Sequence, residues 1–66
     1  MTVIVGKDFS EIGRITLDEG ELRFSGNTAE MKALAEYYKG SMNWSNEELL
    51  EKLPATMNSR VWAKAA

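Results

Sequence analysis

The stretch between residues 13 and 26 alternates apolar and polar side chains on both sides of an acidic turn, and this pattern predicts a β-hairpin. The apolar positions are Ile15 and Leu17 before the turn and Leu22 and Phe24 after it. An isolated hairpin is only marginally stable in water, so its apolar face needs a cover from elsewhere in the chain.

The register of this hairpin is restricted, because both apolar pairs must lie on one face of the sheet. A three-residue loop at 18–20 mixes the faces, whereas a two-residue loop at 19–20 or a four-residue loop at 18–21 pairs apolar residues with each other. The two-residue loop needs a positive φ at both positions, which is easy for Gly20 and costly for Glu19. The sequence therefore leaves both of these loops open.

A β-branched run at 2–5, ended by Gly6, predicts a first strand that leads into a polar connector at 7–11. Ile12 is suited to extend the next strand backwards, and Gly13 then marks a bulge or a close backbone approach. With the hairpin, this strand gives a three-stranded antiparallel meander, with strands at about 2–5, 14–18 and 21–25.

The next segment changes to a helical period and predicts a helix at about 28–39. Asn27 is a good N-cap with Glu30 three residues later, while Lys39 in the last turn and Gly40 after it mark the end. The apolar stripe expected to cover the hairpin consists of Met31, Leu34, Ala35 and Tyr38.

A second helix is predicted at about 46–53. Ser45 and Glu48 form a capping box, Trp44 is placed as a hydrophobic staple, and Pro54 is expected to end the helix. The buried edge of this helix consists of Leu49, Leu50 and Leu53.

The C-terminal segment, 55–66, fits two descriptions. A strand at about 59–64 alternates small apolar residues with two basic residues and a tryptophan, and a helix capped by Thr56 is the alternative. The neighbouring Val61 and Trp62 favour the strand. Together these elements predict an α+β fold in a single domain over residues 1–66: the meander, two helices on one of its faces, and a C-terminal strand returning to the sheet.

Composition narrows the classes of function. The chain of 66 residues has no cysteine and no histidine, which excludes a disulfide framework, a thiol nucleophile and the commonest metal ligand. Ten acidic against eight basic residues disfavour a charge-driven nucleic-acid binder. No apolar run approaches the roughly 20 residues of a membrane span. We expect a soluble cytoplasmic protein with no cofactor, no metal and no membrane contact.

The residues that most resemble catalytic groups are two clusters of carboxylates. They crowd the hairpin turn at 18–21 and the start of the second helix at 47–51, where solvation and the helix dipole explain them. The chain has no glycine-rich phosphate loop, no nucleophile elbow and no zinc-ligand spacing. We therefore expect that the protein is not an enzyme.

Two sets of residues are candidates for partner binding. Arg60, Trp62 and Lys64 form a basic-aromatic alternation that can stack a base and contact phosphates, although Trp62 in the core with its neighbours snorkelling is the simpler interpretation. The second set consists of Tyr37, Met42 and Trp44. Aromatic residues and Met are enriched at interface cores, although Tyr37 as a flank of the hydrophobic seam is the simpler interpretation.

The opening V-I-V-G-x-x-F-x-x-I-G-R-I-T-L-D-E-G-E-L, followed by a short helix and a second capped helix, resembles small uncharacterised proteins of actinobacteria and of the phages that infect them. Some of those proteins close with W-S-N-G before a final strand, whereas here W-S-N at 44–46 comes earlier and opens a helix. The resemblance implies a phage or phage-derived accessory protein and supplies no functional residues.

The leading functional hypothesis is a non-enzymatic interaction module that binds a host or virion protein or self-associates. A small nucleic-acid-binding or transcription-modulating protein that uses the Arg60-x-Trp62-x-Lys64 strand is the alternative. A structural virion component is a third.

Overall fold

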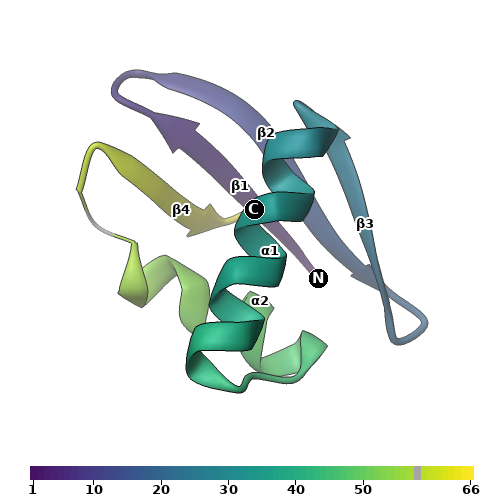
Figure 1. The fold of residues 1–66 in the computed structure, drawn as a ribbon. Coiled ribbons are helices and arrows are strands. Elements are labelled where there is room, and N and C mark those ends of the chain that lie inside the picture. Colours follow the sequence, from purple (N-terminus) through teal and green to yellow (C-terminus); the bar gives the residue numbers. More distant parts are fainter. Residues whose placement is uncertain (58) are drawn as a thin grey trace.

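Four antiparallel strands and two helices make up the structure, a computed structural model that describes residues 1–57 and 59–66. The strands form one sheet in the order β3-β2-β1-β4, and both helices lie on the same side of it (Figure 1). In chain order the elements are β1 (Thr2–Lys7), β2 (Ser10–Asp18), β3 (Glu21–Gly26), α1 (Thr28–Met42), α2 (Asn46–Thr56) and β4 (Val61–Ala65). The predicted α+β class, the meander and the C-terminal strand are confirmed.

The β2–β3 hairpin uses the two-residue loop. Leu17 lies opposite Leu22, and Glu19 and Gly20 have φ angles of 52° and 81°. Positive φ at both loop residues is the geometry that matches the twist of the strands, so the turn accepts the cost of a left-handed Glu19. The four-residue alternative is wrong.

The β1–β2 connection is shorter than predicted. The strands continue to Lys7 and Ser10, which leaves a second two-residue loop at 8–9 in place of the expected polar connector. Further along, the register shifts by one residue, so that Ile12 forms a bulge. Gly13 follows it, and a Cβ atom there would lie 2.6 Å from Cγ of Met31, so the expected bulge and the expected close approach are both present.

Helix α1 begins as predicted and ends later. The side-chain oxygen of Asn27 accepts a hydrogen bond from the Glu30 backbone N–H at 3.2 Å. Gly40 lies inside the helix, and the left-handed position is taken by Asn43, with a φ of 57° and its N–H bonded to the Lys39 carbonyl. The prediction that Gly40 ends the helix is wrong because Asn also tolerates this conformation.

Helix α2 begins with the predicted capping box, but it ends later than predicted. The hydrogen bond from the Ser45 backbone N–H, followed by that from Lys52, lowers the pKa of Glu48. Pro54 lies within the helix, which continues for two more residues and ends with Met57 as its C-cap. A proline removes one backbone donor, and this late in the helix the remaining turn is still closed by the bond from the Met57 N–H to the Leu53 carbonyl at 3.0 Å.

The core lies between the sheet and the helices. α1 packs against β2 and β3, and α2 packs against β4, β2 and β1. Burying each large aliphatic side chain there contributes about 1.5–3 kcal/mol. The buried apolar residues are Val3, Val5, Ile15, Met31, Ala35, Leu49, Leu50, Leu53, Met57 and Ala63. Among the described residues, no helix has the length and apolar character needed to cross a bilayer.

The other face of the sheet carries no helix and is called here the open face. It is formed by the side chains that alternate with the buried ones, and these include Thr2, Ile4, Arg14, Thr16, Arg23, Trp62 and Lys64. β4 is a strand as predicted, with Val61 and Ala63 turned to the core and Trp62 on the open face, so the helical alternative for this segment is wrong.

Candidate functional site

The tip of the β1–β2 hairpin carries the most exposed large apolar side chain among the described residues. Phe9 has an exposed fraction of 104%, so its ring has no shielding from the rest of the chain. It is the second residue of a two-residue loop, and the first, Asp8, has a φ of 55°. An aromatic ring left entirely in water at the end of a folded hairpin is unusual, since an aromatic side chain can bury 150–250 Å².

Three contacts hold the loop against the start of β4. The Asp8 backbone N–H donates to the Arg60 carbonyl at 2.7 Å, and the Trp62 indole N–H donates to the Asp8 carbonyl at 2.7 Å. The guanidinium of Arg60 binds the Asp8 carboxylate with two bonds of 3.1 and 3.2 Å. We call these three contacts the clamp. The loop residue before Phe9 is thus fixed by its N–H, its carbonyl and its side chain.

The clamp depends on a glycine in β1. Gly6 lies opposite Trp62 in the sheet, and a Cβ atom at Gly6 would be 2.0 Å from Cζ2 of the indole ring. Because Gly6 has no side chain, the ring lies across its backbone and the indole N–H reaches the Asp8 carbonyl. Trp62 is therefore partly buried on the open face, neither in the core nor free.

Carboxylates neutralise much of the positive charge on and beside the open face. Arg14 binds Glu11 at 2.9 Å, Arg23 binds Asp18 at 3.0 Å, and Arg60 binds Asp8 in the clamp.

Arg14 and Glu11 also affect each other's titration. The side-chain hydrogen bond from Arg14 lowers the pKa of Glu11, and the same bond raises the pKa of Arg14. Lys64 lies 5.9 Å from the centre of the Trp62 ring. The arginines can therefore contact phosphates only in competition with these carboxylates.

The end of α1 forms a second aromatic cluster. Tyr37 meets Tyr38 edge-on with ring centres 5.2 Å apart, and Tyr38 stacks on Trp44 with centres 6.1 Å apart. Trp44 is partly buried against the core, whereas Tyr37 and Met42 are 66% and 48% exposed. Tyr37 therefore projects from the cluster and does not close the hydrophobic seam.

The structure separates the candidate residues into two groups. The first group lies in β4 and the segment before it, on or beside the open face, and consists of Arg60, Trp62 and Lys64. The second group lies in the helical layer and consists of Tyr37, Met42 and Trp44. Within the described residues, the two groups therefore lie in different layers of the fold.

Sequence reasoning missed Phe9, which lies in the segment interpreted as a polar connector. The available signal was a lone aromatic residue between Asp8 and Ser10, outside any apolar alternation.

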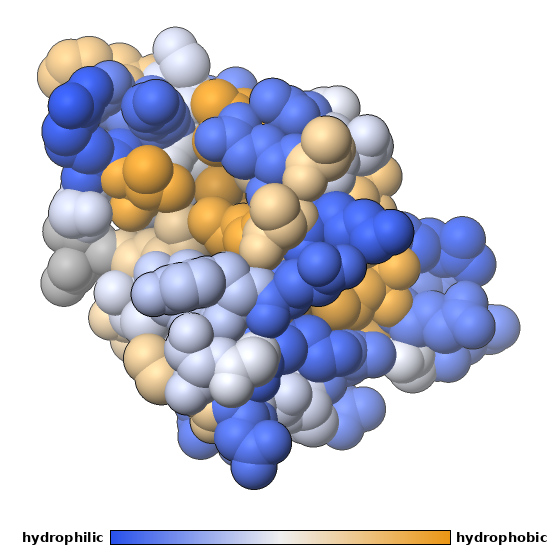
Figure 2. Space-filling view, viewed as in Figure 1, coloured by the Kyte–Doolittle hydropathy of each residue, from blue (hydrophilic) through white to orange (hydrophobic). Residues whose placement is uncertain are grey.

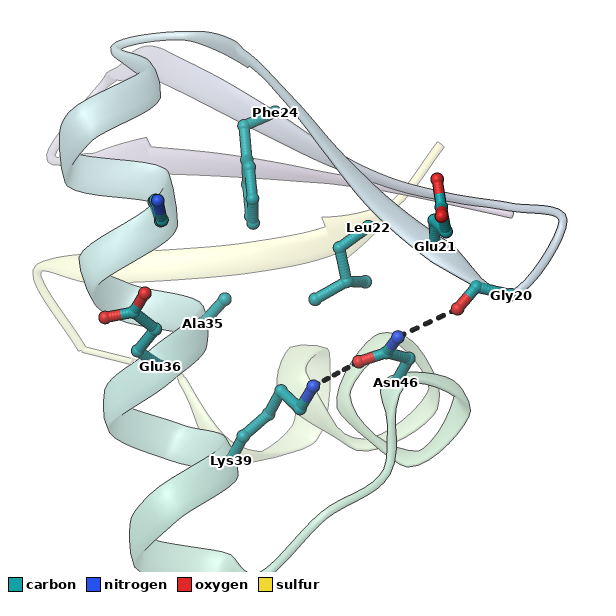
Figure 3. Close-up of a pocket in the computed structure, with 9 residues that line it drawn as sticks. Gly20, Glu21, Leu22, Phe24, Ala35, Glu36, Lys39 and Asn46 are labelled. Carbon is teal, nitrogen blue, oxygen red and sulfur yellow. Dashed lines mark hydrogen bonds between the residues drawn. The ribbon is translucent and has the colours of Figure 1, made fainter.

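A groove runs between α1 and β3 and encloses about 310 Å³. Leu22, Phe24 and Ala35 line it with apolar surface, and Figure 2 shows an orange patch between blue side chains where Figure 1 has α1 beside β3. One end is closed by the Asn46 amide, which donates to the Gly20 carbonyl at 2.9 Å and accepts from the Lys39 ammonium (Figure 3).

The described residues contain no group of three or more His, Cys, Asp or Glu side chains placed to hold a metal ion. Comparison of the chain with protein-family models, with curated proteins and with solved structures finds no match in any of the three. The site geometry is therefore the basis for the functional proposal.

Proposed function

We propose that this chain is a non-enzymatic protein-interaction module that inserts Phe9 into an apolar pocket of a partner protein. The observation that carries the proposal is the full exposure of Phe9 next to a residue held by the clamp. Aromatic side chains that enter pockets dominate the binding energy of protein interfaces.

The clamp makes this mode of binding efficient. Burying a Phe side chain contributes about 1.5–3 kcal/mol, and ordering a mobile loop on binding would offset part of that gain. Asp8 is already fixed to Arg60 and Trp62, so the backbone next to Phe9 loses little further freedom. The hairpin tip is then preorganised for a partner.

The resemblance to small actinobacterial and phage proteins suggests which partners to test. A phage-derived accessory protein would bind a host or virion protein, and self-association through the same tip is the other form of the proposal. An apolar anchor flanked by one ion pair suits a pocket with an apolar interior and a polar rim.

A variant pair tests the proposal. The tagged wild type, Phe9→Ser and Tyr37→Ser are used to capture proteins from an actinobacterial lysate, and the captured protein is purified and titrated by calorimetry. Phe9→Ser is expected to weaken its binding at least about tenfold, while Tyr37→Ser, which removes another exposed aromatic ring from the helical layer, binds as the wild type does. Light scattering on the same proteins measures self-association.

Equal binding by both variants would contradict the assignment to Phe9. A wild type that is monomeric and captures nothing would contradict the interaction module itself. Because the Phe9 side chain makes no buried contact, the melting temperature of Phe9→Ser should match the wild type, which excludes unfolding as the cause of lost binding.

A further inference from the structure

We infer that the groove between α1 and β3 is a second binding site, which takes an extended peptide segment of a partner protein as an added strand on β3. The expected ligand has an apolar residue flanked by acidic residues two positions before and two positions after it. This inference does not depend on the hairpin tip, which lies at the other end of β2 from the loop beside the groove.

β3 offers a free edge for such a strand. It is the outermost strand in the order β3-β2-β1-β4. The Leu17 N–H points to β1, where it donates to the Met1 carbonyl at 2.8 Å, so the pair Leu17–Leu22 is not hydrogen-bonded across β2–β3. Since hydrogen-bonded and free pairs alternate in an antiparallel ladder, the backbone N–H and C=O groups of Leu22 and Phe24 face outward.

The same two residues line the groove beside that edge. Leu22 and Phe24 are only partly buried, and Ala35 on α1 faces them across a space of about 310 Å³. An apolar cavity of roughly 150 Å³ can hold a benzene molecule, so this groove has room for a Leu-sized side chain. A strand paired with β3 places every second side chain on this side of the sheet.

Charge selects the residues that flank the apolar one. Lys32 and Lys39 lie three residues before and four residues after Ala35 on the same side of α1, and both line the groove. Figure 3 shows the carboxylates of Glu21 and Glu36 turned away from the apolar residues, while the Lys39 ammonium points to Asn46. With both carboxylates turned away, the two lysines are the charged lining residues left to meet a ligand beside the apolar surface.

The spacing of the two lysines along α1 matches the spacing of alternate residues in an extended peptide. α1 runs beside β3 in the opposite direction (Figure 1), and the helical rise places the two lysines about 4.5 and 6 Å along the axis from Ala35. Alternate residues of an extended peptide are about 6.6 Å apart. An acidic residue on each side of an apolar one therefore meets a lysine.

A second copy of the chain supplies a poorer ligand. Its β3 would present Leu22 and Phe24 to the groove, with glycines at 20 and 26 on either side and no carboxylate in register. A partner peptide in which acidic and apolar residues alternate on one side fits both the apolar lining of the groove and its two lysines.

The test uses isotope-labelled protein and the peptide acetyl-Thr-Glu-Thr-Leu-Thr-Glu-Thr-amide. On titration, the backbone amide resonances of Leu22 and Phe24 should shift. A peptide with Lys in place of both Glu residues should bind at least about fivefold more weakly, and a peptide N-methylated at alternate residues on the pairing edge should not bind.

Variants of the protein localise the effect. Lys32→Glu should weaken binding about fivefold, whereas Lys64→Glu, the same charge change on the open face, should leave it unchanged. Phe9→Ser should bind the peptide as the wild type does, so failure of the hairpin-tip proposal and failure of this one give different results.

Three results would overturn the inference. The first is that the β3 amide resonances do not shift at millimolar concentrations of the peptide. The second is that the N-methylated peptide binds as tightly as the unmodified one. The third is that the β3 resonances shift with protein concentration when no peptide is present. The last would assign the groove to a second copy.

Discussion

The two hairpins of the meander have loops of the same length, and they reach that length by different means. The β2–β3 loop has positive φ at both Glu19 and Gly20, and a Cβ atom at Gly20 would meet nothing within 4 Å. The β1–β2 loop has a positive φ only at Asp8, which is held by β4. The β2–β3 loop is specified mainly by its own residues, and the β1–β2 loop by residues more than 50 positions away in the chain.

This difference decides what each loop can be used for. A locally specified turn depends little on the rest of the protein, and the β2–β3 turn carries no apolar side chain. A turn held by distant contacts can place an otherwise unfavourable residue, here Phe9, at its tip. The variants below separate the two mechanisms.

The largest expected effect comes from a residue outside either loop. Gly6→Ala should lower the free energy of unfolding by about 2–3 kcal/mol, because the new Cβ atom overlaps the Trp62 ring. Denaturant unfolding measures the loss, and the indole N–H resonance of Trp62 should move as its bond to Asp8 breaks. The matched control is Gly40→Ala in the exposed interior of α1, where nothing lies within 4 Å and a gain of about 0.5–1 kcal/mol is expected. Equal effects at both glycines would mean that the clamp does not hold the β1–β2 loop.

A smaller effect is expected inside the local loop. Gly20→Ala should cost about 1–2 kcal/mol, because alanine is strained at a φ of 81°. Glu19→Asn should act in the opposite direction, by about 0.5–1 kcal/mol, since Asn-Gly is the preferred pair for this turn. Thermal unfolding of the two variants and the wild type gives both signs. A stabilising Gly20→Ala would show that the loop conformation does not persist in solution.

The smallest effect concerns the pH dependence of stability, through Glu11 near the tip of the β1–β2 hairpin. The Arg14 hydrogen bond lowers the pKa of Glu11 below its usual value of 4.5, so the unfolded chain binds this proton more readily. The contribution of Glu11 to stability is therefore present above about pH 4.5 and is lost as pH falls through its lowered folded pKa. Glu11→Gln should unfold with a shallower dependence on pH from about pH 5 downward. The double variant with Arg14→Gln should match the single one. An unchanged slope in Glu11→Gln would contradict the pairing.

Local signals in the sequence were sufficient for most of the fold. The Asn27 and Ser45 caps, the apolar stripes of both helices and the pairing of Leu17 with Leu22 all follow from short-range chemistry. The errors lie where neighbouring structure overrides a local preference. Gly40 did not end α1 because Asn43 takes that position, and Pro54 did not end α2 because the last turn closes without its donor.

The candidate site was less accessible to such reasoning. Trp62 and Arg60 were identified as notable, yet their role in holding Asp8 requires the pairing of β1 with β4, which no local pattern specifies. Phe9 looked like an ordinary loop residue because exposure is a property of the finished fold. The groove likewise exists only once α1 lies beside β3.

The clamp also orders events in folding. The meander and α1 involve contacts that are near in sequence, whereas Asp8 and Arg60 are 52 residues apart and meet only when β4 docks beside β1. Closing so long a loop is slow compared with forming a hairpin. The β1–β2 tip is therefore held by the clamp only after β4 has docked beside β1, and a chain truncated before Arg60 lacks all three contacts of the clamp.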